Sequence, residues 1–258
     1  MLFRSVRRAL WPASKTQIPT TTFQFDAVVE PGEISARFDS GPTSLDRDNV
    51  FRSPSILQLR PEDRLSREEA RAELGIDQNA FAVSLMLGVA DNFDFGGIRA
   101  TLVKAVLEDG TTDIIEFIQP WQAEERRNRG MRHRTQAAYP AFRLSRAFDY
   151  AIACAGYNTF HEHMFGQVPT IFVPNEAPEM DRQLLRARHA KAIGCAELVR
   201  ASDRISVPDV VSRMSDAAHR AEMVSRMKLH VFDDGARSTA RFIERHCHYL
   251  TLNRPLAG

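Results

Sequence analysis

The amino-acid sequence predicts an α/β fold, a single Rossmann-like parallel sheet with helices on both faces. Short apolar runs alternate with helical patterns from about residue 54 to residue 250, and this alternation is typical of parallel sheets covered on both faces. Glycine and proline separate the runs at most boundaries. The chain has 258 residues, of which 43% are hydrophobic and 26% charged, so it can bury the core of one large or two small globular domains.

The first element of this domain carries the clearest local signal. Ser66 and Glu69 have the spacing of a capping box, which predicts a helix from Arg67 to Leu74 that Gly75 ends. Strands are expected at 81–87, 113–118, 150–154, 170–173 and 197–199, and helices at 98–107, 142–148, 159–165, 182–193, 208–227 and 236–246. The stretch 124–136 holds five arginines and two glutamates, so we interpret its arginine cluster as a solvated loop. The alternative is that this cluster, at 126–134, faces the phosphate of a lipid-linked acceptor or an acidic patch of a partner.

Residues 1–53 differ in composition and read as a hinge-like segment that precedes the domain at 54–250. They hold one predicted strand, from Phe23 to Glu30, closed by Pro31-Gly32. Because one strand cannot bury a core of its own, the segment is expected to pack on the following domain or on a partner chain. Residues 251–258 read as a tail.

Charge and cysteine content restrict the class of protein. The formal net charge is +1, which gives no general attraction to nucleic acid. The three cysteines are Cys154, Cys195 and Cys247, an odd number that favours reduced thiols and a cytoplasmic location. No apolar run reaches the roughly 18 to 20 residues that span a bilayer. Arginines opposite a short apolar face in the first ten residues leave a peripheral membrane contact open as an alternative.

The segment most informative about function is a junction between a strand and a helix. A buried strand is expected to end at Cys154, and a helix to begin near Asn158 and Thr159. The unpaired N–H groups and positive dipole of that helix end would lie at the carboxyl edge of the sheet, where phosphate binds. Gly156 would let a ligand approach the backbone. Such junctions occur throughout α/β proteins, so these residues alone favour a phosphate site and a purely structural turn about equally.

Further polar residues are expected at the same edge. Glu162 lies about one turn into the helix, where its carboxylate suits a ribose diol better than a phosphate. The next strand runs into Pro174 and Asn175, and the loop after it carries Asp181 and Gln183, whose hydrogen-bonding groups suit sugar hydroxyls.

These residues also form an ordered set of motifs that resembles the C-terminal domain of glycosyltransferase family 28, a GT-B family that includes the N-acetylglucosaminyltransferase that makes lipid II. The motifs are an A-G-x-x-T…E helix, a G-x-P-x-I-x-V-P strand, then an acidic residue and a Q-x-x-x-A helix. In this sequence they comprise Ala155, Gly156, Thr159, Glu162, Gly166, Pro169, Ile171, Val173, Pro174, Asp181, Gln183 and Ala187. The resemblance covers some 45 residues closely and extends weakly over 54–250.

The resemblance implies a function and a role for each matching residue. It implies transfer of a hexosyl group from a UDP-sugar to an acceptor hydroxyl on a glycan or lipid-linked acceptor, with no metal or other cofactor. The diphosphate would be held by Gly156, Tyr157, Asn158 and Thr159, the ribose by Glu162, and the sugar by Asp181 and Gln183. Of the glycine-rich loop that the family has after its first donor-domain strand, only Gly88 matches.

The second departure from the family leaves an alternative open. A GT-B enzyme has two Rossmann-like domains, and here most of the acceptor-binding domain has no counterpart. The chain is therefore either the transferase itself or a catalytically incomplete donor-binding module, as a fragment or as one subunit that needs an acceptor-domain partner chain. His133 and His161 are candidates for a general base, although both lie within the donor half.

Three other motifs are weaker. Asp46-Arg47-Asp48 matches the metal-binding D-x-D of a different glycosyltransferase fold but lacks its strand context. His161 and His163 flank Glu162 at a spacing that puts them on different faces of a helix, which favours structural roles over zinc binding. The G-x-G-x-x-G of dinucleotide oxidoreductases is absent after both candidate strands.

Overall fold

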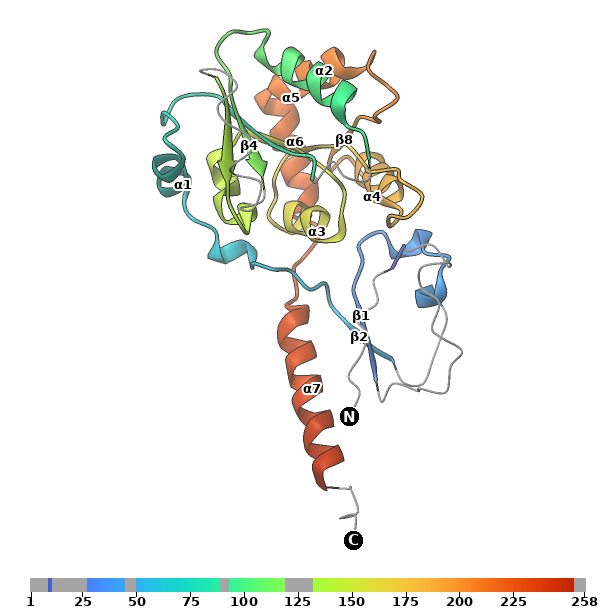
Figure 1. Cartoon of the computed structure of the whole chain (residues 1–258). Coiled ribbons are helices and arrows are strands. Elements are labelled where there is room, and N and C mark those ends of the chain that lie inside the picture. Colours follow the sequence, from blue (N-terminus) through green and yellow to red (C-terminus); the bar gives the residue numbers. More distant parts are fainter. Residues whose placement is uncertain (1–8, 11–26, 45–49, 89–92, 119–131, 253–258) are drawn as a thin grey trace. The chain divides into compact units, whose positions relative to one another are not determined.

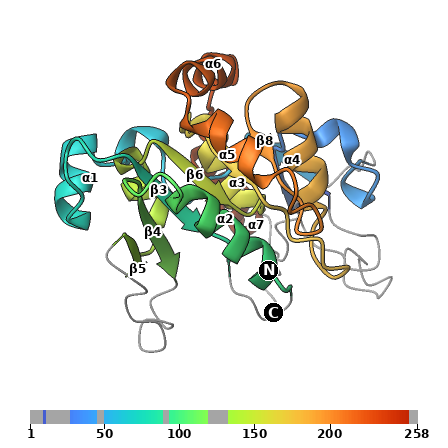
Figure 2. The ribbon, with the colours of Figure 1, turned by 90° about the horizontal axis from the view of Figure 1, so that it is seen from above.

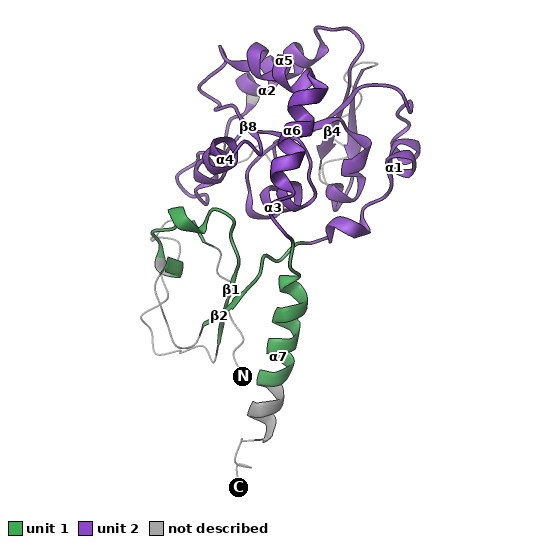
Figure 3. Cartoon of the chain, turned by 180° about the vertical axis from the view of Figure 1, so that it is seen from behind, with its two compact units in different colours: residues 1–57, 232–258 green, residues 58–231 purple. Residues whose placement is uncertain are grey.

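The computed structural model describes residues 9–10, 27–44, 50–88, 93–118 and 132–252. It divides the chain into two compact units, shown in Figure 3. Unit 1 comprises residues 1–57 and 232–258, and unit 2 comprises residues 58–231. The sequence analysis placed residues 54–250 in one domain. In the structure, the last predicted helix, at 236–246, belongs to unit 1, which also holds the N-terminal segment.

Unit 2 is built on six parallel strands, which confirms the predicted α/β class (Figure 1). They are β3 (Ala82–Met86), β4 (Asp113–Ile118), β5 (His133–Ala137), β6 (Tyr150–Ala153), β7 (Thr170–Phe172) and β8 (Glu197–Leu198). Their order across the sheet is β5-β4-β3-β6-β7-β8. The chain therefore moves outward from β3 to β5, returns to the other side of β3, and continues outward to β8. The strand order reverses between β3 and β6, which makes this pair the topological switch point.

Helices precede, connect and follow these strands. They are α1 (Arg67–Leu74), α2 (Gly96–Leu107), α3 (Tyr157–Phe165), α4 (Gln183–Ala192), α5 (Val207–Ser215) and α6 (Ala217–Met227). The predicted capping box of α1 is confirmed, because Ser66 Oγ accepts from Glu69 N at 3.2 Å and Glu69 Oε2 accepts from Ser66 N at 3.0 Å. Gly75 ends α1 with a φ of 61°.

The helices cover both faces of the sheet. Ile115 and Phe117 of β4 face one side, where they pack with α1 and with the 3₁₀ helix η5 (Ala141–Ala147). Glu116 points to the other side, where its carboxylate accepts from Arg99 Nε of α2 at 2.9 Å. The helix α5 packs beside α2 on that side, as two perpendicular views show (Figures 1 and 2). Because successive side chains of β4 point to opposite faces of the sheet, one face is covered by an apolar layer and the other by a layer that contains a buried ion pair.

Three predicted elements of unit 2 were wrong in detail. The arginine cluster 126–134 was predicted as a solvated loop, but its last two residues, His133 and Arg134, begin β5, an edge strand whose polar, half-exposed side chains hide the usual apolar signal. The helix expected at 142–148 is the 3₁₀ helix η5. The helix expected at 208–227 is broken at Asp216, whose side chain accepts from Ala218 N at 2.9 Å and begins α6.

Unit 1 contains a strand that the sequence analysis did not find. β1 (Val28–Pro31) pairs in parallel with β2 (Val50–Ser53), and α7 (Gly235–Leu252) packs on β2. The rings of Phe51 in β2 and Phe242 in α7 stack with centroids 4.3 Å apart. This strand pair and helix supply the apolar surface that one strand could not provide.

Several predicted features lie outside the described residues. They are the N-terminal arginines, Asp46-Arg47-Asp48, and the arginine cluster up to residue 131. Within the described part of the chain, no helix combines the length and the apolarity that crossing a membrane requires.

Candidate functional site

The carboxyl ends of β3 and β6 meet at the switch point of the sheet. Met86 and Ala153 are register partners at the ends of these strands, and the chain continues to Gly88 on one side and to Cys154 on the other. Cys154 Sγ donates to the carbonyl oxygen of Leu87 at 2.9 Å. Gly88 has a φ of 77°, a conformation that favours glycine. The structure therefore brings Gly88, predicted as a site residue, next to the turn that leads into α3.

That turn ends in the N-terminus of α3, which begins at Tyr157, two residues earlier than the sequence predicts. Gly156 is the N-cap residue, and no side chain caps the helix. The first hydrogen bond within α3 runs from Phe160 N to Gly156 O at 2.8 Å. The N–H groups of the first turn, from Tyr157 to Thr159, therefore point out of the helix end, where the helix dipole is positive. This arrangement attracts an anion, and it lies at the edge of the sheet where α/β proteins bind ligands.

Gly156 leaves this helix end uncovered. Its φ of −63° and ψ of 155° are open to any residue. A Cβ placed there would have the Nε2 atom of Gln183 as its nearest neighbour, at 3.8 Å, which is ordinary van der Waals contact. Neither backbone conformation nor packing therefore requires glycine at this position. What the missing side chain provides is free access to the backbone in front of α3.

Glu162, one turn further along α3, is a buried carboxyl group with spare hydrogen-bonding capacity. The residue is only 5% exposed, and burial raises its pKa to about 7, against a smaller opposing effect of a hydrogen bond from the Gln58 backbone. Its Oε1 atom has no hydrogen-bond partner among the described residues. Leaving a buried polar atom unpaired costs about 1 to 3 kcal/mol, so Glu162 Oε1 is a candidate acceptor for a ligand hydroxyl.

The loop between β7 and α4 is held by buried polar contacts. Pro174 and Asn175 follow β7, and Asn175 N donates to Gln183 Oε1 at 3.1 Å. Gln183 Nε2 donates to Asp181 Oδ1 at 3.4 Å. Asp181 and Gln183 are 5% and 3% exposed. The structure thus brings together Asn175, Asp181 and Gln183 and places Gln183 next to Gly156, with the side chains of all three bonded to the protein.

Sequence reasoning missed Arg186, the residue on which this loop depends. Its side chain is fully buried, forms an ion pair with Asp181, and donates from Nη1 to the carbonyl oxygen of Ala155 at 3.2 Å. Its guanidinium carbon also lies 5.8 Å from the ring centroid of Tyr157. Arg186 therefore links the β7–α4 loop to the turn before α3. The sequence offered one signal for Arg186, which lies three residues after Gln183 on the same face of a predicted helix.

The two candidate bases do not join this site. His133 begins β5 at the amino edge of the sheet, opposite the switch point, and its Nε2 lies 3.1 Å from Glu116 Oε2. Burial opposes ionisation of Glu116, but hydrogen bonds from His133 and Arg99 outweigh it and lower the pKa of Glu116 to about 2. His161 is fully buried, with Nδ1 2.7 Å from the carbonyl oxygen of Tyr157. Both imidazoles are thus engaged in the interior of unit 2.

The other flanking histidine is also buried. His163 Nδ1 lies 3.0 Å from Thr170 Oγ1, and burial lowers the pKa of His163 to about 3, so this imidazole stays neutral. In the part of the chain that the structure describes, no three His, Cys, Asp or Glu side chains converge closely enough to hold a metal ion.

Comparison with known proteins identifies neighbours by structure alone. No protein-family model and no curated protein matches the sequence. Among solved structures, the spinosyn rhamnosyltransferase SpnG is 15% identical, with a TM-score of 0.57 over 86% of this chain and 57% of its own. MurG from Acinetobacter baumannii is 15% identical, with a TM-score of 0.54 over 85% of this chain and 67% of its own. The calicheamicin glycosyltransferase CalG4 is 15% identical, with a TM-score of 0.54 over 90% of this chain and 56% of its own.

At this level of identity the likeness is one of fold. The chain spans about 57% of the length of SpnG, and the matching parts are α/β. The chain therefore shares a Rossmann-like α/β fold with these solved structures.

Proposed function

We propose that this chain binds the nucleoside diphosphate of a sugar donor at the switch point between β3 and β6, and that it functions in transferring a hexosyl group from a UDP-sugar to an acceptor hydroxyl. The observation that carries the proposal is the convergence of Gly88 and the uncapped N-terminus of α3 at the carboxyl edge of the sheet. The fold likeness to glycosyltransferases supports it.

The first turn of α3 would hold the diphosphate. Backbone N–H groups from Tyr157 to Thr159 would donate to its oxygens, and the side chains of Asn158 and Thr159 would add polar contacts. Gly156 would let the phosphates reach the backbone without meeting a side chain. The same dipole would stabilise the negative charge that develops on the leaving diphosphate during transfer, so the chemistry would not depend on a metal.

Glu162 would bind the ribose. Its Oε1 atom has no partner among the described residues, and a ribose diol offers two hydroxyl donors. Binding would satisfy a buried atom that is unsatisfied without ligand, so the interaction would gain more than a hydrogen bond at the surface.

The sugar would be contacted by Gln183, the first residue of α4, whose amide lies beside Gly156. Asn175 and Pro174 would shape the approach to it. Asp181 is already paired with the buried Arg186, so its contribution to sugar binding would run through the position of the β7–α4 loop.

The choice of uridine rests on the resemblance to glycosyltransferase family 28. Two neighbouring structures carry a different base, since SpnG is described as complexed with thymidine diphosphate and VinC with dTDP. A thymidine donor is therefore the specific competitor that a binding experiment must include.

A second candidate is a donor-binding module that requires an acceptor-domain partner for catalysis. What favours it is that the two candidate bases lie in the interior of unit 2, with His133 beside Glu116 and His161 beside the carbonyl oxygen of Tyr157. In this case the chain would bind the donor but transfer no sugar by itself.

Calorimetric titration of the full chain with UDP, UDP-N-acetylglucosamine, dTDP and NAD tests the proposal. Binding of the uridine ligands in preference to NAD is expected, whereas absence of nucleoside diphosphate binding by the folded chain would reject a donor site. Comparison of the affinities for UDP and dTDP shows whether the site prefers uracil or thymine. Assay of donor turnover with the same sample then separates the transferase from the donor-binding module.

A further inference from the structure

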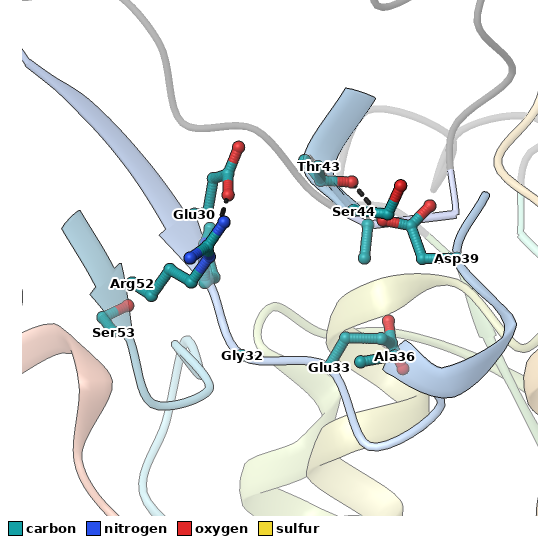
Figure 4. A pocket seen from close by; sticks show the side chains of 11 residues that line it. Glu30, Gly32, Glu33, Ala36, Asp39, Thr43, Ser44, Arg52 and Ser53 are labelled. Atoms are coloured by element: carbon teal, nitrogen blue, oxygen red, sulfur yellow. Dashed lines mark hydrogen bonds and ion pairs between the residues drawn. The ribbon is translucent and has the colours of Figure 1, made fainter. Parts of the chain in front are cut away.

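Glu162 differs from the other buried acids in the described part of the chain. Four of these acids form ion pairs with an arginine, namely Glu30 with Arg52, Glu116 with Arg99, Asp181 with Arg186 and Glu197 with Arg213. Figure 4 shows the first of these pairs in the pocket of unit 1, where Glu30 Oε2 lies 3.5 Å from Arg52 Nε. Glu162 is as deeply buried as Glu30, at 5% exposed, but no charged group among the described residues contributes to its pKa.

The charged and titratable groups of α3 and of the elements packed on it have partners other than Glu162. They are Arg60 and Arg64 before α1, Arg143 and Arg146 in η5, Tyr150 and Cys154 in and after β6, His161 and His163 in α3, and Asp181 and Arg186 before and in α4. Arg143, for example, pairs with Glu73, and Arg64 donates to Pro61 O at 2.9 Å. The protein therefore supplies no cation that would hold Glu162 in its ionised form.

Hydrogen bonds to the Glu162 carboxyl group are also few. It accepts one from the backbone N–H of Gln58, and its Oε1 atom has no partner among the described residues. A carboxylate taken out of water needs a cation or several donors to remain ionised, and otherwise takes up a proton. In agreement with this, burial raises the pKa of Glu162 to about 7, and the single hydrogen bond from Gln58 opposes it only weakly.

A ribose diol would supply the donors that the protein does not. Its two hydroxyl groups can both donate to a carboxylate, whereas the protonated acid offers fewer acceptor lone pairs. Hydrogen bonds to the charged form of a carboxyl group favour that form. Bound ribose would therefore stabilise the ionised state of Glu162 over the neutral state.

We infer that donor binding is coupled to ionisation of Glu162, which is a neutral acid below neutral pH in the free chain and becomes a carboxylate when the ribose diol binds. Only the O–H bond of the carboxyl group breaks, and the proton passes to the solvent. The site would thus bind its donor tightly at neutral pH and weakly in acid. This inference rests on the donor site and the ribose contact proposed above, and adds regulation by pH to them.

Calorimetric titration of the full chain with UDP-N-acetylglucosamine at pH 6 and pH 8 tests the coupling. UDP itself is unsuitable, because its terminal phosphate has a second ionisation near pH 6. Since the pKa of Glu162 is about 7, binding is expected to be about tenfold weaker at pH 6 than at pH 8. Repeating each titration in two buffers with different enthalpies of ionisation counts the protons. Release of close to one proton per donor is expected at pH 6, and of almost none at pH 8.

Two variants assign the proton to its group. Glu162→Gln should bind the donor with equal affinity at both pH values and release no proton, while the exposed Glu108→Gln should keep the pH dependence of the natural chain. The proton count of the natural chain does not require the Glu162 variant to fold. Equal affinity of the natural chain at both pH values, or a tenfold dependence that persists in Glu162→Gln, would overturn the inference and leave the donor site standing. Absence of binding by the folded chain at both pH values would instead reject the donor site, and the inference with it.

Discussion

The fully buried guanidinium of Arg186 in α4 forms an ion pair with the carboxylate of Asp181, five residues earlier in the chain. The same guanidinium donates to the carbonyl oxygen of Ala155 at 3.2 Å, in the turn that leads into α3. One side chain thus connects the loop after β7 with the turn after β6. These are the two segments that carry most of the proposed donor site.

Arg186→Met is expected to destabilise the protein by about 3 to 5 kcal/mol, because it leaves the Asp181 carboxylate buried without a cation. Urea denaturation measures the change, with the exposed Arg188→Met on the same helix as control. Adding Asp181→Asn to the Arg186 variant removes the unpaired charge and should recover part of the loss. A loss below about 1 kcal/mol in the single variant would show that the pair does not hold the loop.

Gly156→Ala is expected to leave stability nearly unchanged but to weaken UDP binding about tenfold, or 1.4 kcal/mol. The added methyl group fits the protein, with its nearest neighbour at 3.8 Å, but occupies the space in front of α3. Gly166→Ala is the contrasting variant, since its Cβ would come within 2.6 Å of the Phe142 ring and should cost about 1 to 3 kcal/mol of stability. Thermal denaturation and calorimetry separate the two effects. Unchanged UDP affinity in Gly156→Ala would argue against close approach of phosphate at this position.

Glu162 is expected to make stability depend on pH. Burial raises the pKa of Glu162 from 4.5 to about 7, so between these values the folded state binds more protons than the unfolded state. Its contribution is therefore fully present below pH 4.5 and is lost as pH rises toward 7. Glu162→Gln should stabilise the protein at pH 8 by up to roughly 3 kcal/mol and should change its stability little at pH 5.

Chemical denaturation at pH 5 and pH 8 measures this difference. The exposed Glu108→Gln is the control and should have the same effect at both pH values. If Glu162→Gln behaved like the control, the Glu162 carboxyl group would be better solvated than its burial indicates.

Glu162 should also decide the preference for ribose. The natural chain is expected to bind UDP more tightly than 2′-deoxy-UDP, and Glu162→Gln should lower UDP affinity by about 1 to 3 kcal/mol, the scale of hydrogen bonds to a charged group. In the variant the difference between the two nucleotides should shrink, since the group that reads the diol is altered. Calorimetry measures the affinity of both nucleotides for both proteins. A preference of the same size in both proteins would remove Glu162 from ribose recognition.

Local signals in the sequence were enough to predict most of the fold of unit 2. The capping box at Ser66 and Glu69 and the left-handed Gly75 act within one helix, and apolar runs marked the buried strands. The junction at Gly156 was predictable for the same reason, because strand, turn and helix are consecutive in the chain. Even there, the helix begins two residues before its predicted start.

Features that depend on contacts between distant segments were missed. β5 is an edge strand with half-exposed side chains, so its sequence lacks the apolar run that marked the central strands. β2 becomes recognisable only through its pairing with β1 and its packing against α7. The burial of Arg186 follows from partners on two other segments, which a single sequence does not reveal.

The proposed donor site places a nucleoside diphosphate at the N-terminus of α3 beside Gly88. The most direct test is to titrate the isotope-labelled full chain with UDP and follow the backbone amide resonances by NMR. The largest shifts are expected at Gly88 and at Gly156 to Thr159, with inorganic diphosphate shifting the same amides and NAD causing little change. Saturable shifts confined to other regions, such as β5 or the pocket of unit 1, would contradict it.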